Sequence, residues 1–293
     1  MPFSTVGVVG TGTMGQGIAH VCALAGQRVR MLDADAAKVE GAIARIGREL
    51  DAATQRPPEK GGISPAERDA ALANLAGVSA VEGLAGVDVV VEAIPERLEW
   101  KQDLFRALAP VAPNAVYATN TSSLSIAAIA TAAPDPTRVI GTHFFNPVPR
   151  MKLLELIVHD GTAPEVLAEA QAWGAAIGKT TVLVRDVPGF ATSRLGVCIG
   201  MEAIRMVEQG VASAADIDTA MRLGYGFPVG PLELSDMVGL DVRLMIGEYL
   251  ARELANPAFE PPALMRTMVA EGKLGKKVGQ GFYAWDASGK RVG

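Results

Sequence analysis

The feature that most constrains the fold is a glycine-rich turn near the N-terminus. The apolar run Val6–Val9 is followed by Gly10, Gly12 and Gly15 in the spacing G-x-G-x-x-G, and a helical pattern begins directly afterwards. In dinucleotide-binding turns the first glycine makes the tight turn, the second lets the backbone approach a pyrophosphate, and the third lets helix and strand pack closely. The spacing alone is a weak signal, and the flanking strand and helix strengthen it.

A carboxylate lies where a dinucleotide site needs one. The next apolar run, Arg28–Leu32, ends at Asp33, about 20 residues beyond the glycines. A carboxylate there accepts hydrogen bonds from a ribose and repels a 2′-phosphate, which favours NAD over NADP. The N–H groups at the start of the helix, near Thr13 and Met14, would meet the phosphates. We therefore predict an NAD site, and an ordinary turn beside a surface aspartate is the disfavoured alternative.

Composition narrows the class of protein. The chain has 293 residues, of which 49% are hydrophobic, and a net charge of −5. The length suits two domains, and the acidic balance argues against a nucleic-acid partner. Because we find neither an apolar run near the ~18 residues of a membrane span nor a basic leader, we expect a cytoplasmic enzyme with no membrane partner. Cys22 and Cys198 indicate buried free thiols rather than a disulfide framework, and we predict no metal.

Apolar runs alternate with helical patterns over residues 1–185. This alternation is typical of an α/β Rossmann-type fold, a doubly wound parallel sheet covered by helices on both faces. Near the end of this region we also expect a helix at Ala163–Ile177. The expected strands are Val6–Val9, Arg28–Leu32, a run near Gly77–Ala80, Asp88–Ala93, Ala115–Ala118, Val139–Thr142, Leu153–Val158 and Thr180–Val184.

A long connection after Asp33 contains two helical patterns. Ala36–Thr54 and Pro65–Leu75 are separated by Arg56–Gly62, whose prolines and glycines force a turn. We predict a helical hairpin inserted into the first domain. The hairpin carries charged residues of both signs, so its charge pattern alone favours a solvent-exposed surface over a binding site.

From residue 186 the periodicity becomes helical, and we place the domain boundary there. Residues 1–185 form the predicted NAD-binding domain and residues 186–293 an all-α C-terminal domain. A helical domain of this kind often supplies a cleft wall and an oligomer interface. The expected helices are Thr192–Gln209, Ala214–Leu223, Pro231–Asp236, Asp241–Ala255 and Pro262–Glu271.

Side chains beyond the carboxyl ends of parallel strands are the candidates for chemistry. Ser122 and His143 follow different strands and emerge at one edge of the predicted sheet. A hydride transfer from a secondary alcohol needs a base of near-neutral pKa, which histidine supplies. Glu155 can return across a Pro-containing corner to hold the other ring nitrogen, although an ordinary, satisfied histidine fits the spacing equally well. His20, inside the first helix, is interpreted as structural.

Seven segments carry a family resemblance over essentially the whole chain. They are GTGTMGQGIA, DVVVEAIPE, ATNTSSL, THFFNPVPRMKLLE, DVPGF, DIDTAMRLGYGFPVGPLEL and KLGKKVGQGFY. In order and spacing they resemble the L-3-hydroxyacyl-CoA dehydrogenase family, and within it the single-function bacterial 3-hydroxybutyryl-CoA dehydrogenases. The resemblance implies an NAD-binding domain and a helical domain that forms a homodimer. It also implies that an acyl-CoA substrate binds in the cleft between the domains, where L-3-hydroxyacyl-CoA and 3-ketoacyl-CoA are interconverted.

The resemblance also assigns roles to residues. His143 aligns with the catalytic base, Glu155 with its carboxylate partner, and Ser122 with the hydroxyl donor. The family holds the CoA phosphates and adenine at the helical hairpin, so Arg48 and Arg56 become candidate substrate contacts. The resemblance implies that six positions line the NAD and nicotinamide site: Ala93, Glu96, Lys101, Asn120, Asn146 and Lys277. It also implies that Asn146 contacts the substrate.

One position departs from the family pattern. The family usually has P-G-F-x-x-N-R, in which the asparagine contributes to substrate binding or catalysis, and this chain has Ser193 in its place. Serine has a shorter reach and no amide, so we expect either action through a water or a different acyl pocket, with activity retained. Two other functions stay open: a dehydrogenase of a free 3-hydroxy acid, such as a sugar acid or carnitine, and a non-catalytic NAD-binding protein.

Overall fold

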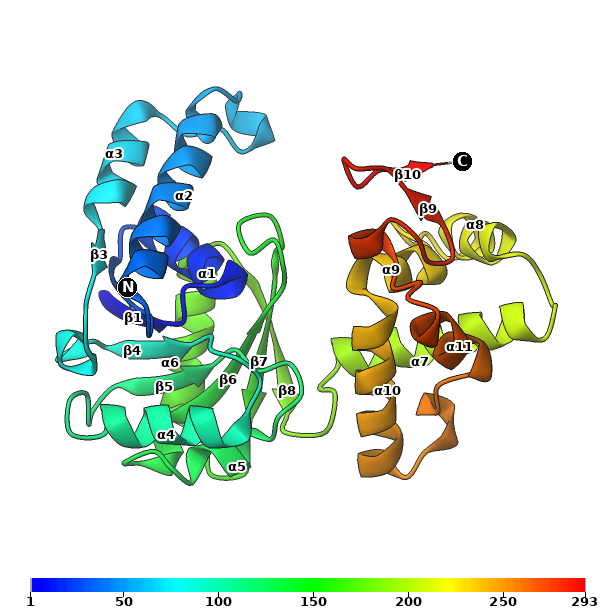
Figure 1. The fold of residues 1–293 in the computed structure, drawn as a ribbon. Coiled ribbons are helices and arrows are strands. Elements are labelled where there is room, and N and C mark those ends of the chain that lie inside the picture. The colour runs from blue at the N-terminus through cyan, green and yellow to red at the C-terminus, as the bar shows by residue number, and fades with distance from the viewer. Residues whose placement is uncertain (1, 293) are drawn as a thin grey trace. The chain divides into compact units, whose positions relative to one another are not determined.

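The computed structural model describes residues 2–292, which divide into two compact units between Val187 and Pro188 (Figure 1). The division lies close to the boundary expected between residues 185 and 186. The first unit contains a large sheet with its covering helices, and the second is mainly helical.

The first unit is built on an eight-stranded sheet in the order β3-β2-β1-β4-β5-β6-β7-β8. Neighbouring strands from β3 to β6 are parallel. The strand order reverses at β1, and such a switch point is where open α/β sheets bind ligands. The strands are β1 (Thr5–Val9), β2 (Arg28–Leu32), β3 (Leu75–Gly77), β4 (Val89–Glu92), β5 (Val116–Thr119), β6 (Val139–Phe144), β7 (Leu153–Val158) and β8 (Thr180–Arg185).

The expected parallel pairing does not hold at one edge of the sheet, where β7 runs antiparallel to β6. Residues 145–152 join the two strands, and this connection is shorter than the roughly a dozen residues that a crossover between parallel strands needs. β8 is parallel to β7. The Rossmann-type fold is confirmed, with this two-strand extension of mixed direction.

Helices cover both faces of the sheet. On one face, Val6 and Val89 belong to a buried cluster that includes Ile18 of α1 (Thr13–Leu24) and Trp173 of α6 (Pro164–Ala176). On the other face lie α4 (Leu98–Leu108) and α5 (Ile126–Ala130) (Figure 1). The Phe105 ring of α4 packs edge-on to Tyr117 of β5, with ring centroids 5.0 Å apart. This burial on both sides explains why the strands are continuous apolar runs.

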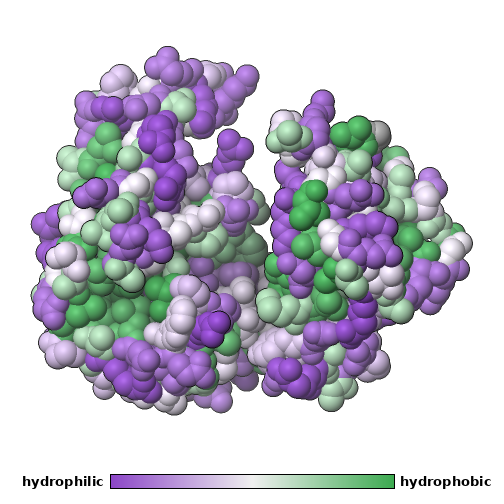
Figure 2. All heavy atoms as spheres, in the orientation of Figure 1, coloured by the Kyte–Doolittle hydropathy of each residue, from purple (hydrophilic) through white to green (hydrophobic). Residues whose placement is uncertain are grey.

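The predicted helical hairpin is present as α2 (Ala36–Thr54) and α3 (Pro65–Ala73). A capping box between Ser64 and Glu67 starts α3, as the sequence pattern S-x-x-E favours. One face of α2 is buried against the core, whereas the outer end of the hairpin extends beyond the sheet (Figure 1). The surface of this outer end is mostly hydrophilic (Figure 2).

In the described part of the second unit, residues 188–292, five α-helices pack around a separate core. The buried core includes Met201, Ile204, Leu232, Leu250 and Met265. A short antiparallel pair, β9 (Ala284–Trp285) and β10 (Arg291–Val292), corrects the expectation of an all-α domain. Within the described range 2–292, no helix is long and apolar enough to span a membrane. The helices are α7 (Thr192–Glu208), α8 (Ala214–Gly224), α9 (Pro231–Val238), α10 (Leu240–Leu254) and α11 (Ala263–Ala270).

Candidate active site

The glycine turn has the geometry that its spacing predicts. Gly10 has a φ of +93°, which favours glycine, and a Cβ there would lie 2.6 Å from the Ala93 carbonyl oxygen. A Cβ at Gly15 would lie 1.7 Å from the Gly10 carbonyl oxygen, so α1 approaches the turn too closely for a side chain. By contrast, a Cβ at Gly12 would meet no atom within 4 Å. The backbone at Gly12 is therefore open to close approach by a ligand.

Asp33 is held at the end of β2 by the same turn. Its Oδ2 accepts a hydrogen bond from the Thr11 backbone N–H at 2.7 Å and another from the Thr11 hydroxyl at 3.0 Å. Burial acts to raise the pKa of Asp33, but the Thr11 hydrogen bonds, the Asp35 N–H and the charge of Lys38 together outweigh burial, so the pKa lies below its usual value. The carboxylate is thus ionised at neutral pH.

A cleft of about 710 Å³ opens at the switch point between β1 and β4. Its lining includes the glycine turn and Asp33, together with Ala93–Pro95 from the segment after β4. The N–H groups at the start of α1 can receive a pyrophosphate next to the open backbone of Gly12. The ionised Asp33 can accept ribose hydroxyls. These residues fit a bound dinucleotide.

Three further side chains line the cleft, and sequence reasoning did not assign them to it: Lys38, Arg45 and Trp100. Lys38 and Arg45 are seven residues apart on α2, and residues two helical turns apart share a face. That spacing is the signal that could have found them. Arg45 is also oriented, because its Nε donates to Gln16 Oε1 at 2.6 Å.

His143 and Glu155 face each other across β6 and β7. They are directly opposite in the register, and His143 Nδ1 lies 2.7 Å from Glu155 Oε2. The Glu155 side chain is 0% exposed and that of His143 is 10% exposed. When the carboxylate accepts from Nδ1–H, Nε2 keeps its lone pair and can take a proton. The arrangement has the geometry of an oriented general base at the carboxyl end of β6, and the catalytic role of His143 stays a prediction.

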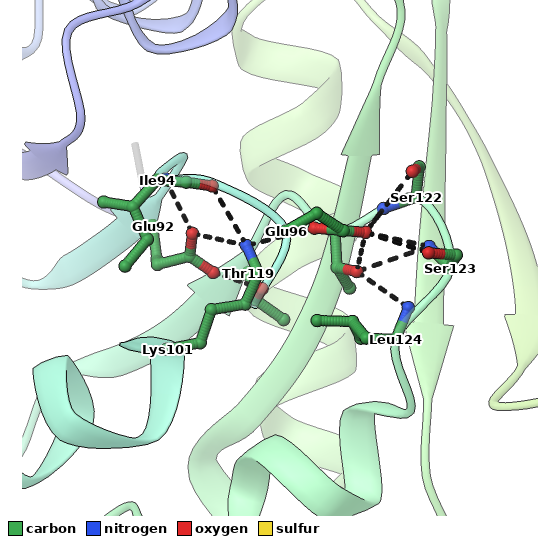
Figure 3. Close-up of polar contacts among 9 residues, drawn as sticks. Glu92, Ile94, Glu96, Lys101, Thr119, Ser122, Ser123 and Leu124 are labelled. Carbon is green, nitrogen blue, oxygen red and sulfur yellow. Dashed lines mark hydrogen bonds and ion pairs between the residues drawn. The ribbon is translucent and has the colours of Figure 1, made fainter. Parts of the chain in front are cut away.

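Ser122 lies in the loop after β5, and Glu96 organises this loop (Figure 3). Glu96 Oε1 accepts hydrogen bonds from the Thr121 hydroxyl at 2.5 Å and from the backbone N–H groups of Ser122 at 2.9 Å and Ser123 at 3.2 Å. The Ser122 hydroxyl lies 3.3 Å from the same oxygen. The Ser122 hydroxyl is thus placed at the rim of the sheet that also carries His143.

Lys101 and Glu92 lie beneath this loop as a buried pair. Lys101 Nζ is 2.7 Å from Glu92 Oε1 and 3.3 Å from Glu96 Oε2, and the Lys101 side chain is 1% exposed. Burial raises the pKa of Glu92, although the charge of Lys101 and the Thr119 hydroxyl act in the opposite direction. The Lys101 ammonium group already forms ion pairs with the carboxylates of Glu92 and Glu96. A direct contact between Lys101 and the cofactor therefore stays a prediction.

The two asparagines of the predicted site have different surroundings. Asn120 Oδ1 accepts a hydrogen bond from the Phe144 backbone N–H at 3.0 Å, so it ties the loop after β5 to the end of β6. Asn146 is exposed in the connection between β6 and β7. Its contacts with cofactor and substrate stay predictions.

The remaining predicted site residues lie on the hairpin or in the second unit. Arg48 and Arg56 are exposed on the hairpin. Ser193 is in the first turn of α7, and Lys277 Nζ pairs with both carboxylate oxygens of Asp241 at 2.6 Å. Their predicted contacts with substrate or cofactor are untested. Among residues 2–292, no group of histidine, cysteine and acidic side chains is arranged to hold a metal ion.

The fold and the cleft define a dinucleotide-binding dehydrogenase with a helical second domain. Residues 5–187 match the family model of the NAD-binding domain of 3-hydroxyacyl-CoA dehydrogenase, and residues 189–285 match the model of its C-terminal domain. The chain therefore belongs to the 3-hydroxyacyl-CoA dehydrogenase family. It is an NAD-dependent oxidoreductase.

Individual relatives cover the chain almost completely. A probable 3-hydroxybutyryl-CoA dehydrogenase of Bacillus subtilis is 39% identical over 98% of this chain and 99% of its own length. The crystal structure of (S)-3-hydroxybutyryl-CoA dehydrogenase from Ralstonia eutropha is 38% identical, covers 97% of this chain and 99% of that chain, and has a TM-score of 0.92. A 3-hydroxyadipyl-CoA dehydrogenase of Escherichia coli is 40% identical over 98% of this chain and 60% of its own length.

Proposed function

We propose that the chain interconverts short L-3-hydroxyacyl-CoA thioesters, such as 3-hydroxybutyryl-CoA, and the corresponding 3-ketoacyl-CoA. The observation that carries the proposal is the buried His143–Glu155 pair, which lies on the same sheet as the dinucleotide cleft. A general base at one strand end and a dinucleotide cleft at another are what an alcohol dehydrogenation requires.

The proposed proton path uses three side chains. In the oxidation direction His143 Nε2 takes the proton of the C3 hydroxyl as the C3–H bond breaks, and the carbonyl forms between C3 and its oxygen. Glu155 Oε2, which lies 2.7 Å from His143 Nδ1, accepts the hydrogen bond from Nδ1–H and stabilises the imidazolium. The Ser122 hydroxyl donates a hydrogen bond to the C3 oxygen. When bound, NAD supplies the acceptor for the hydride that leaves C3.

The short acyl chain is supported by the names of two relatives that act on 3-hydroxybutyryl-CoA. A third relative is named for 3-hydroxyadipyl-CoA, which carries a second carboxyl group. Ser193, which replaces the usual asparagine, is a candidate for tuning this choice because serine fills less space. The exposed Arg48 and Arg56 are the proposed contacts for CoA phosphates.

We also propose a homodimer formed through the second unit, and a cytoplasmic location. Large apolar side chains of this unit are exposed, with Leu223 at 84%, Tyr225 at 79% and Leu195 at 64%. Exposed apolar side chains in such number support a protein interface. Cys22 and Cys198 are unpaired, which fits a reducing compartment.

The test is a series of kcat/KM measurements on 3-ketoacyl-CoA thioesters of increasing length, with NADH and with NADPH. We expect oxidation of NADH, highest efficiency with acetoacetyl-CoA, and much lower efficiency with NADPH because Asp33 repels the 2′-phosphate. A 3-ketoadipyl-CoA arm measures the effect of a terminal carboxylate. Activity on free 3-keto acids but not on thioesters would reject the proposed substrate class.

A second arm tests the hairpin. The double variant Arg48→Gln, Arg56→Gln should raise KM for acetoacetyl-CoA and leave KM for acetoacetyl-pantetheine, which lacks the CoA phosphates, unchanged. Arg222→Gln, at an exposed arginine of α8, is the matched control. An equal KM for acetoacetyl-CoA in the double variant and the wild type would remove these arginines from the proposal.

A further inference from the structure

A single carboxylate oxygen collects five donors from the loop that carries Ser122. Glu96 Oε1 accepts from the Thr121 hydroxyl and the N–H groups of Ser122 and Ser123, and the hydroxyls of Ser122 and Ser123 lie 3.3 and 3.2 Å away. A carboxylate oxygen has about two lone-pair sites, so five donors cannot all bond well at the same time. The Ser122 hydroxyl has the longest of these distances, and a hydroxyl hydrogen rotates freely. It is therefore released to another acceptor more easily than the Thr121 hydroxyl, which lies 2.5 Å from the same oxygen.

Glu96 is itself held from below. Lys101 Nζ lies 3.3 Å from its Oε2 and 2.7 Å from Glu92 Oε1. Glu92 in turn accepts from the Thr119 hydroxyl at 2.6 Å and from the Ile94 N–H at 2.8 Å. The chain of contacts therefore runs from the buried ends of β4 and β5, through α4, to the loop at the rim (Figure 3).

The charge state of Glu96 suits this role. Burial acts to raise its pKa, but Lys101 and the loop donors outweigh burial, so the pKa lies below its usual value. An ionised carboxylate only accepts hydrogen bonds. It therefore attracts the hydroxyls and N–H groups of residues 121–123 that face it, and it cannot compete with Ser122 as a donor to a substrate oxygen.

We infer that Glu96 is a positioning residue for the Ser122 hydroxyl, and that the buried Glu92–Lys101 pair fixes Glu96 in place. Before substrate binds, Glu96 holds the Ser122 loop and its hydroxyl. When a 3-keto or 3-hydroxy oxygen is present, the Ser122 hydroxyl turns to that oxygen while Thr121 and the two backbone N–H groups keep the loop fixed. The inference rests on the proposed function, because it takes the C3 oxygen as the acceptor.

The resemblance suggests a different role for Glu96, that of a direct NAD contact, and the two roles predict different kinetics. A cofactor contact acts independently of Ser122, so loss of both residues multiplies the individual effects. A positioning residue acts through Ser122, so its loss adds little once the Ser122 hydroxyl is absent. A cofactor contact also changes the Kd for NADH, whereas a positioning residue changes kcat.

The experiment is a double-mutant cycle of Glu96→Gln and Ser122→Ala, with kcat, KM for acetoacetyl-CoA and Kd for NADH measured for each protein. We expect each single variant to lower kcat by roughly 10-fold, the size of one lost hydrogen bond to a charged group. The double variant should be within about 2-fold of Ser122→Ala, with the Kd for NADH within about 2-fold of wild type throughout. Glu99→Gln, at an exposed glutamate of the same helix, is the matched control.

Two results would overturn the inference: losses in kcat that multiply in the double variant, or a rise in the Kd for NADH that accounts for the loss in kcat/KM. Thermal unfolding identifies a variant that fails to fold, and Glu96→Asp then replaces Glu96→Gln in the cycle. Wild-type protein that does not oxidise NADH with acetoacetyl-CoA would reject the proposed function. An active wild type with multiplying losses rejects only the positioning role.

Discussion

Two histidines of the first unit each pair with a glutamate through Nδ1, and the pairs differ in their surroundings. His143 and Glu155 are 2.7 Å apart on adjacent strands, and Glu155 is fully buried. His20 and Glu49 are 2.9 Å apart on α1 and α2, and 49% of the Glu49 side chain is exposed. The first pair lies at the carboxyl end of β6, and the second lies between helices. The same chemical pair is therefore a candidate base in one place and a packing contact in the other.

The difference lies in what fixes the carboxylate. The register of β6 and β7 places Glu155 opposite His143, and burial shields the pair from water. Glu49 faces solvent, which screens its charge. Although the Glu49 carboxylate acts to raise the pKa of His20, burial of the imidazole has the larger effect and lowers this pKa from 6.5. Geometry at a strand end, rather than the presence of a His–Glu pair, is what indicates a catalytic base.

Replacing each histidine gives the largest expected contrast. His143→Gln should lower kcat by ~10²–10⁴, the usual effect of losing a general base. The Kd for NADH should stay near the wild-type value, because His143 does not line the dinucleotide cleft. His20→Gln should change kcat by less than about 2-fold. Comparable losses from the two replacements, measured by steady-state NADH oxidation, would break the comparison.

Replacing the glutamates should give a smaller contrast in the same direction. Glu155→Gln removes the charge that stabilises the imidazolium and should lower kcat by roughly 10²-fold, less than loss of the base itself. Glu49→Gln should leave kcat within about 2-fold of wild type. The measurement is kcat for both variants at neutral pH. A large loss of kcat in Glu49→Gln would show that the His20–Glu49 pair contributes to catalysis and would contradict the comparison.

The smallest expected effect is on stability and its pH dependence. Because the folded protein favours neutral His20, the stability from this preference is complete above the unfolded-state pKa of about 6.5. It is lost as pH falls from there through the lowered folded-state pKa. The Tm of wild type should therefore fall more than that of His20→Gln between about pH 7.5 and about pH 5.5. His159→Gln, at a histidine whose Nε2 lies 3.1 Å from the Pro136 carbonyl oxygen, is the control. Equal Tm changes in wild type and His20→Gln would show that His20 does not contribute.

Much of the fold could be predicted because its elements leave strong local signals. The predicted runs Arg28–Leu32 and Leu153–Val158 match β2 and β7, and Ala36–Thr54 matches α2. Buried strands are continuous apolar runs, and helix ends carry caps and prolines. The roles of Gly10 and Gly15 also follow from the sequence, because each forbids a side chain for a steric reason.

The direction of β7 could not be read in the same way. An apolar run has the same composition whichever way the strand points, so Leu153–Val158 fits either direction. Only the short connection at residues 145–152 distinguishes the two. The His143–Glu155 pairing depends on that direction, which is why the spacing left an ordinary histidine as an equal alternative.

The support under Ser122 was also beyond local sequence reasoning. Glu92 and Lys101 are charged residues, which are usually exposed, yet both are buried here because they neutralise each other. Their contact with Glu96 and Thr119 depends on how β4, β5 and α4 pack.

The strands β9 and β10 could not be predicted from the sequence, because each has only two residues and so leaves too weak a pattern.

The central claim is that the protein transfers a hydride between NADH and C3 of the acyl group, and that His143 transfers the proton to or from the C3 oxygen. The most direct test uses NADH with deuterium at the transferable C4 position, acetoacetyl-CoA, and mass spectrometry of the product. We predict that wild type forms 3-hydroxybutyryl-CoA carrying the deuterium at C3, and that His143→Gln forms it at ~10²–10⁴-fold lower rate. Absence of deuterium from the product of wild type, or equal rates for the two proteins, would contradict the account.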